Sequence, residues 1–140
     1  MTNSLDEIVV VTESGHVLAK YIPASVAWRP GLSFFSDDLD FIQVGTWGYD
    51  SGKKLASHMH NEVTRESHRT QEVVFVRRGK IRAVVLGSTG CQLAAFDLSP
   101  GDLLLLLGGG HGYEILHNGT EVLEIKNGPY LGPDVDRRRI

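Results

Sequence analysis

A chain of 140 residues with 41% hydrophobic content is the size of one globular domain and can bury a core without disulfides. Its 14 basic and 17 acidic residues leave a net charge of -3, and the only basic cluster is the terminal Arg137–Arg139, which argues against nucleic-acid binding. Asp6 and Glu7 stand where a secretion signal would need positive charge, and no apolar run approaches membrane-spanning length. We therefore expect a cytoplasmic protein.

The single cysteine limits the chemistry further. Cys91 has no second cysteine with which to form an intrachain disulfide. It opens the apolar run Cys91–Phe96, and a cysteine in such a run is typically buried. We expect an inert thiol rather than a nucleophile.

Short runs that are β-branched, or that alternate polar and apolar residues, recur along the chain between turn signals such as Asp50-Ser51-Gly52 and Asn118-Gly119. Runs at this spacing predict an all-β sandwich or barrel in which most connections are hairpins. The predicted strands are, in chain order, Ile8–Thr12, His16–Tyr21, Phe41–Trp47, Lys54–His60, Glu72–Arg78, Ile81–Leu86, Gln92–Leu98, Asp102–Leu107, His111–Leu116 and Glu121–Lys126.

Three segments need separate interpretation. Ala24–Phe35 is ambiguous between a short helix and a loop over a barrel mouth. The five leucines Leu103–Leu107 predict a strand that is buried on both faces or lies at a subunit contact. Gly128–Pro133 cannot continue a sheet. We expect N-terminal strands over residues 1–35 that pack on the barrel or on a dimer partner, a barrel over 36–127, and a C-terminal tail over 128–140.

The pattern His58-Met59-His60 indicates a metal site. Alternate residues of a strand share a face, so these two imidazoles lie side by side. Glu72 and His111 each open a later predicted strand and supply a third and a fourth candidate ligand. Such a set suits one divalent Fe, Mn, Ni, Co or Zn ion and leaves a position for water or a substrate oxygen. The competing interpretation is that these polar side chains at strand ends simply face solvent.

Ser57–His60, Gln71–Gly79 and Ser99-Pro100-Gly101-Asp102 followed by His111 resemble the two sequence motifs of the cupin superfamily. The resemblance covers roughly residues 43–126. It implies a single domain with a double-stranded β-helix of jelly-roll type. In that family the first motif supplies two histidines and a glutamate, and the second supplies a histidine after a Pro-Gly-Asp turn.

The family places its glutamate only a few residues after the second histidine, whereas Asn61–Gln71 intervenes here. A hairpin loop inserted after His60 would accommodate this segment. The tighter spacing to Glu72 is met by His68, although its partner two positions earlier is Glu66 and the pattern becomes Glu-x-His. The polar loop favours the earlier pair of histidines, and His68 stays open as a replacement for one of them.

Ile115 is a second departure, at a position where the family has an asparagine of structural importance, so the ligand assignment is unaffected. Ser57–Asn61, Arg69–Val73 and Gly108–Tyr113, with Gly128-Pro129-Tyr130 at the end, also resemble small single-domain cupins. Those cupins are often associated with bacterial surface-polysaccharide and sugar-nucleotide pathways. This looser resemblance implies a sugar-like substrate class.

Two residues are candidate proton carriers. Tyr113 lies two positions after His111 and shares its face, so its phenol can reach the pocket as a hydrogen-bond donor or general acid, with core packing as the equal alternative. His68 is a loop residue at the border of the pocket and is either a proton carrier or simply exposed. Glu124 and Lys126 share a face that could line the interior, although a surface ion pair is the default.

Four residues are candidate substrate contacts. Gln43 and Trp47 share one face of the predicted strand before the histidines and shape the substrate site if that face points inward. Arg65 and Arg69 flank the polar loop and can hold a carboxylate or phosphate by paired hydrogen bonds. Such arginines are more often merely solvated.

These features support three functional hypotheses. The first is a metal-dependent cupin enzyme for a small polar metabolite, with isomerase, epimerase or lyase-like proton transfer on a sugar-type substrate by Tyr113, His68 or a hydroxide on the metal. The second is an Fe(II) dioxygenase. The third is a sugar- or metabolite-binding module without chemistry of its own.

We expect a small-molecule ligand, no nucleic acid, no membrane and a homodimer. The apolar run Leu103–Leu107 and the early strands Ile8–Thr12 and His16–Tyr21 offer more apolar and edge surface than one small barrel hides. Related cupins commonly pair through such strands.

Overall fold

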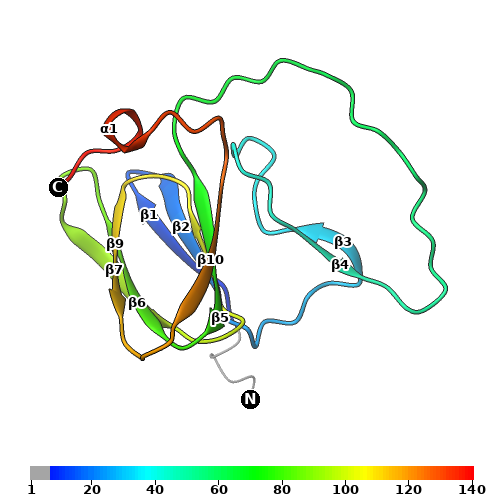
Figure 1. The fold of residues 1–140 in the computed structure, drawn as a ribbon, viewed down its shortest axis with the longest axis horizontal. Coiled ribbons are helices and arrows are strands. Elements are labelled where there is room, and N and C mark those ends of the chain that lie inside the picture. The colour runs from blue at the N-terminus through cyan, green and yellow to red at the C-terminus, as the bar shows by residue number, and fades with distance from the viewer. Residues whose placement is uncertain (1–6) are drawn as a thin grey trace.

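Two antiparallel sheets stand face to face in the computed structural model, which describes residues 7–140 (Figure 1). The large sheet has five strands in the order β1-β2-β8-β5-β10, and the small sheet has three in the order β7-β6-β9. The all-β prediction is therefore confirmed; residues 1–6 of the predicted N-terminal part lie outside the described residues. The large sheet contains β1 (Val9–Glu13), β2 (His16–Ile22), β5 (Glu72–Arg78), β8 (Leu103–Leu106) and β10 (Glu121–Lys126); the small sheet contains β6 (Ile81–Leu86), β7 (Gln92–Leu98) and β9 (Gly110–Ile115).

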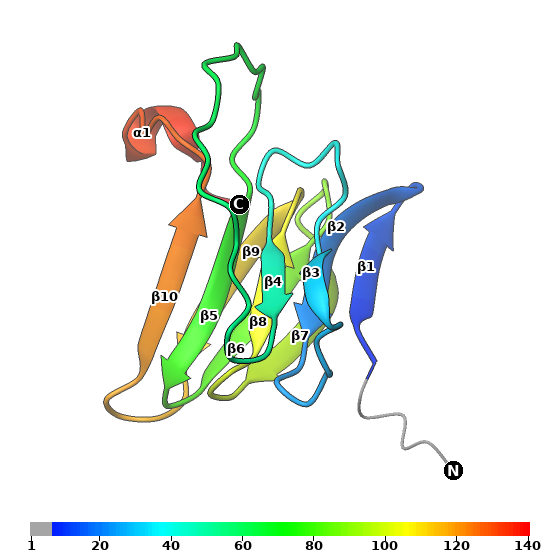
Figure 2. The same cartoon turned by 90° about the vertical axis from the view of Figure 1, so that its right-hand side faces the viewer.

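A separate hairpin lies over the outer face of the large sheet (Figure 2). Its strands are β3 (Gly31–Phe34) and β4 (Gly45–Gly48). Ile42, in the loop between them, belongs to a buried cluster on that outer face. The remaining buried members of this outer cluster are Ile22, Val73, Leu105 and Leu107. After β10 the chain ends with the single-turn helix α1 (Pro133–Asp136).

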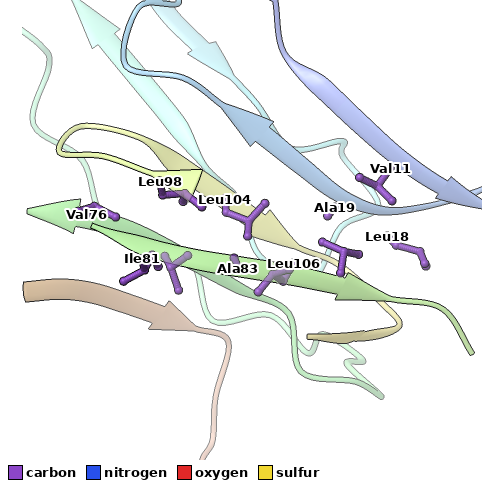
Figure 3. Close-up of a cluster of buried hydrophobic side chains, with 11 residues drawn as sticks. Val11, Leu18, Ala19, Val76, Ile81, Ala83, Leu98, Leu104 and Leu106 are labelled. Carbon is purple, nitrogen blue, oxygen red and sulfur yellow. The ribbon is translucent and has the colours of Figure 1, made fainter. Parts of the chain in front are cut away.

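The leucine run fills two cores at once. Leu104 and Leu106 belong to the inner cluster between the two sheets (Figure 3), whereas Leu105 and Leu107 belong to the outer cluster. This alternation confirms a strand buried on both faces, because successive side chains of β8 point in opposite directions. The burial takes place within one chain, so these four leucines do not provide the exposed apolar surface on which the dimer prediction partly rested.

Most predicted strands form with nearly the predicted bounds, and four of them match residue for residue: Glu72–Arg78, Ile81–Leu86, Gln92–Leu98 and Glu121–Lys126. Two predictions were wrong in part or whole. Of Phe41–Trp47 only the end joins a strand, and Lys54–His60 has no regular secondary structure. An alternating pattern needs a neighbouring strand to satisfy its backbone, and Lys54–His60 has none in its own chain. The ambiguous Ala24–Phe35 holds the short strand β3.

Gln71 fixes the point where the chain re-enters the large sheet. Its buried amide oxygen accepts hydrogen bonds from the backbone N–H groups of Phe41 and Ile42, at 2.7 and 3.1 Å. Its amide nitrogen donates to the carbonyl oxygen of Leu107 at 3.1 Å. Before this clamp, residues 49–69 contain no helix or strand, and every one of them is exposed. We call residues 49–69 the arm.

Asp102 organises the tight turn that leads into β8. Its buried carboxylate accepts hydrogen bonds from the backbone N–H groups of Ala24 and Ser99, at 2.7 and 2.8 Å, and from the Tyr21 hydroxyl at 3.2 Å. Burial, together with the charge and hydrogen bond of this carboxylate, raises the pKa of Tyr21 to about 12. Asp102 therefore ties the turn to β2 and to the segment that follows β2.

Replacing Asp102 by alanine is expected to lower the free energy of unfolding by about 1–3 kcal/mol, because two backbone N–H groups lose their acceptor. Urea unfolding followed by circular dichroism measures the change. Asp97→Ala is the matched control, since Asp97 lies in an exposed ion pair with Arg82 that is worth roughly 0–1 kcal/mol. Equal losses in the two variants would contradict the role given to Asp102.

The prediction of a buried thiol was wrong. Cys91 is exposed, because it lies at the turn just before β7 rather than within a buried face of that strand. Strand β7, which follows Cys91, alternates between the two faces of the small sheet, and within this strand only its last residue, Leu98, is fully buried.

Among residues 7–140, the structure contains no helix long and apolar enough to span a bilayer.

Candidate functional site

A buried carboxylate lies where the large and small sheets meet. Glu72 opens β5 and is only 4% exposed. Its Oε1 atom lies 2.9 Å from Nε2 of His111 and accepts a hydrogen bond from the Tyr113 hydroxyl at 3.0 Å. Its Oε2 atom lies 3.5 Å from Nζ of Lys126, which also lies 3.3 Å from Oε1 of Glu124. We call these five residues the Glu72 cluster.

Strand register explains why these side chains meet. Lys126 is the direct partner of Glu72 in the pairing of β10 with β5, so the two side chains share the inner face of the large sheet. His111 and Tyr113 are two residues apart on β9 and therefore point the same way, toward that face from the small sheet. The prediction that Tyr113 and His111 share a face is confirmed by their common contact with Glu72.

The Glu72 cluster combines a buried carboxylate with partly exposed partners. The side chain of Glu72 is 5% exposed, whereas those of His111 and Lys126 are 34% and 31% exposed. Tyr113 is also partly exposed. A bound molecule would therefore meet His111, Tyr113 and Lys126 first, with the carboxylate behind them.

Burial by itself would raise the pKa of the Glu72 carboxyl group. The hydrogen bond and charge of His111, assisted by the hydrogen bond from Tyr113, outweigh burial and lower this pKa from 4.5 to about 2. Burial and the negative charge of Glu72 raise the pKa of Tyr113 well above its usual value. Burial by itself would lower the pKa of the Lys126 ammonium group. Its hydrogen bond with Glu124 and the negative charge of Glu72 outweigh burial and raise this pKa. Glu72 is therefore ionised at neutral pH, and Tyr113 keeps its proton.

These shifts predict a pH-dependent stability. Because the pKa of Glu72 is lower in the folded than in the unfolded chain, its contribution is present above pH 4.5 and is lost as the pH falls toward about 2. The difference in unfolding free energy between the native protein and Glu72→Gln should therefore shrink through that range. Urea unfolding at a series of pH values measures this difference. The exposed Glu121→Gln serves as control, and a Glu72→Gln difference that stays constant with pH would contradict the prediction.

The four predicted metal ligands are not brought together within one chain. Glu72 and His111 are in contact, but His58 and His60 lie exposed in the arm, with their rings 5.1 Å apart. Over residues 7–140, no group of three or more His, Cys, Asp or Glu side chains is placed to hold a metal ion. The residues of a single chain therefore do not fit the predicted metal centre, because catalytic sites typically use three protein ligands.

The other predicted site residues lie at the base of the arm or over the outer face of the large sheet. Gln43 makes local hydrogen bonds, to the Ser36 hydroxyl and to nearby backbone carbonyls. Trp47 is exposed on β4, and Arg65 is exposed in the arm. The ring of His68 lies edge-on to Phe41 with centroids 4.9 Å apart, and the Arg69 guanidinium lies 5.9 Å from the same ring.

The sequence did not predict the roles of two residues, Lys126 in the Glu72 cluster and Gln71 beside it. Lys126 was recognised only as sharing a face with Glu124, and the signal that places it beside Glu72 is its position at the end of the strand that pairs with β5. Gln71 carried no signal beyond its place next to Glu72, because an amide clamp depends on backbone groups that are distant in sequence.

Comparisons with known proteins give no relative for this chain. A scan against protein-family models and searches of curated proteins and of solved structures found no match to this chain.

Proposed function

We propose that this protein is an enzyme with a cupin-type jelly-roll fold that transfers protons on a small, polar, sugar-like metabolite, in an isomerase, epimerase or lyase type of reaction at the Glu72 cluster. The observation that carries the proposal is the buried, ionised Glu72 in contact with a partly exposed histidine and a protonated phenol. A carboxylate held against a histidine in this way is an arrangement used for general acid–base catalysis.

Each residue has a chemical role in the proposal. His111 takes a proton from a substrate carbon next to a carbonyl group and returns it to the neighbouring atom, so no other reactant is consumed. Glu72 orients the imidazole and stabilises its positive charge through the contact of 2.9 Å. The ammonium group of Lys126, which has three donor hydrogens, stabilises negative charge that develops on the substrate oxygen, and the Tyr113 hydroxyl holds the Glu72 carboxylate in place through its hydrogen bond. No step is assigned to a metal, because the predicted ligands do not come together within residues 7–140, the part that the structure describes.

Deuterium exchange tests the proposal. The native protein is incubated in deuterium oxide with a panel of keto-sugars and nucleoside diphosphate sugars, and mass spectrometry detects deuterium beside the carbonyl group. Incorporation into at least one compound, at the same rate with and without oxygen, is the expected result. Incorporation that requires oxygen would favour the Fe(II) dioxygenase, and no incorporation in any compound would overturn the proposal.

One observation favours a second candidate, the non-catalytic binding module. Both carboxylate oxygens of Glu72 already have partners within the chain, as in a structural network that needs no substrate. Isothermal titration with the same sugar panel separates the two candidates. Binding without any deuterium incorporation would establish the module.

A further inference from the structure

We infer that an open cavity beside the hairpin β3–β4 binds a free aromatic α-amino acid. The cavity has a volume of about 530 Å³ and lies on the outer side of the large sheet, whereas the Glu72 cluster lies on the inner side. The inference therefore goes beyond the proposed function and does not depend on it. It rests on exposed aromatic walls, on two hydroxyl groups without partners and on two opposite charges that line the same cavity.

Three segments enclose the cavity. They are the described residues just before β1, the segment 26–29 that follows β2, and the hairpin, which Figure 2 shows in front of the large sheet. Val26 and Phe35 also line the cavity and pack against the outer cluster, so the cavity borders the core on this side. Sites for small molecules typically have volumes of about 300–1000 Å³, and this cavity lies within that range.

Two aromatic side chains form walls of the cavity and are only half covered. Trp28 is 55% exposed and Phe34 is 51% exposed. Cε1 of Phe34 lies 2.9 Å from the position that a Cβ atom would take at Gly45, so the ring rests against a backbone that has no side chain. Exposed aromatic side chains in a concave surface favour a ligand with an apolar ring.

The wall that carries Trp28 is held at both ends. The backbone N–H of Ala24 donates to the Asp102 carboxylate at 2.7 Å. At the other end, the carbonyl oxygen of Arg29 lies 3.5 Å from the position that a Cβ atom would take at Gly48. The segment is therefore ordered before a ligand arrives, which lowers the entropic cost of binding.

Two hydroxyl groups at the cavity have no hydrogen-bond partner. Ser33 and Thr46 are direct partners in the pairing of β3 with β4, so they share one face of the hairpin. Among residues 7–140, neither hydroxyl makes a hydrogen bond, although Thr46 is only 6% exposed. Every fully enclosed side-chain polar atom in this part of the chain has a partner, so the Thr46 hydroxyl opens to the cavity that it lines. A largely buried hydroxyl in this state is suited to a polar group of a ligand.

Two opposite charges also line the cavity. Within the part of the chain that the structure describes, Arg29 and Glu7 form no ion pair with each other or with any further residue. A ligand that carries a carboxylate and an ammonium group on neighbouring atoms satisfies both side chains, because the guanidinium donates to the carboxylate and Glu7 accepts from the ammonium group. A simple anion would face the charge of Glu7, and a simple amine would face that of Arg29.

An aromatic α-amino acid combines these features in one molecule. Its two charged groups match Arg29 and Glu7, and its ring packs against Trp28 and Phe34. The Thr46 hydroxyl is available to the ligand carboxylate or to a hydroxyl group on the ring. No bond forms or breaks in this assignment, so the cavity is a binding site and not a second active site.

Isothermal titration of the native protein with L-phenylalanine and two analogues tests the inference. Phenylpropionate lacks the ammonium group, and phenylethylamine lacks the carboxylate. We expect L-phenylalanine to bind at least about 10-fold more tightly than either analogue, because each analogue leaves one charged side chain unpaired. A change of tryptophan fluorescence in Trp47→Phe, where Trp28 is the only tryptophan of the chain, locates the binding at the cavity.

Two substitutions assign the charged groups. Arg29→Gln should weaken the binding of L-phenylalanine by about 10-fold or more and leave that of phenylethylamine nearly unchanged. Glu7→Gln should weaken L-phenylalanine in the same way and leave phenylpropionate nearly unchanged. Arg65→Gln is the matched control, because Arg65 is an exposed arginine of the arm that does not line the cavity. Circular dichroism verifies that each variant is folded.

Three results would overturn the inference: no binding of L-phenylalanine at millimolar concentration, equal affinity for all three compounds, or equal losses in Arg29→Gln and Arg65→Gln. A fluorescence change of Trp28 with glucose in place of the amino acid would identify a sugar site and would also overturn it.

Discussion

Replacing His111 by glutamine is expected to slow deuterium exchange into the substrate by about 100-fold or more, the usual contribution of a general acid–base residue. Glutamine has no basic nitrogen, but its amide can still donate a hydrogen bond to Glu72. The fold should therefore survive. The rate measured by mass spectrometry under saturating substrate reports this loss.

Two further variants make the result specific. His16→Gln, at an exposed position that opens β2, should leave the rate unchanged. Glu72→Gln should slow exchange while substrate binding persists, because an amide cannot stabilise a charged imidazole as a carboxylate does. An unchanged rate in His111→Gln, with substrate still bound, would refute the assignment of His111 as the base.

Replacing Leu104 by alanine is expected to lower the free energy of unfolding by about 2–5 kcal/mol. Leu104 is fully buried between the two sheets, so its truncation leaves a cavity that the surrounding strands cannot close (Figure 3). Urea unfolding monitored by circular dichroism gives the change. Leu39→Ala is the matched control, because Leu39 is 92% exposed and its truncation should change the free energy by less than about 0.5 kcal/mol. A similar value for both variants would mean that Leu104 is not a core residue.

The sequence was most informative where a local pattern has one structural solution. The bounds of β5, β6, β7 and β10 follow from alternating or β-branched runs that end at turn signals. The leucine run predicted a strand buried on both faces or at a subunit contact, and the first alternative is the one found. The shared face of His111 and Tyr113 follows from strand geometry alone. Each of these inferences uses residues that are close in the chain.

Prediction was weaker where the outcome depends on distant partners. Lys54–His60 has the pattern of a strand, but a strand also needs an edge to pair with, and no local signal says whether that edge is in the same chain. The same limit applies to Lys126, whose position beside Glu72 depends on the register of two strands. The exposure of Cys91 was missed for another reason, because the apolar run did not reveal that the turn extends to this residue. The sequence therefore identified His58 and His60 as candidate ligands by residue type and spacing, but it did not show which residues surround them in the fold.

The double-sided packing of β8 has a consequence for how the molecule unfolds. Leu104 and Leu106 belong to the inner cluster, and Leu105 and Leu107 belong to the outer cluster. Because both clusters share β8, the unfolding of one cluster removes packing contacts from the other. The two layers should behave as a single cooperative unit. The backbone amides of β8 should be among the slowest to exchange with heavy water, at rates set by global opening.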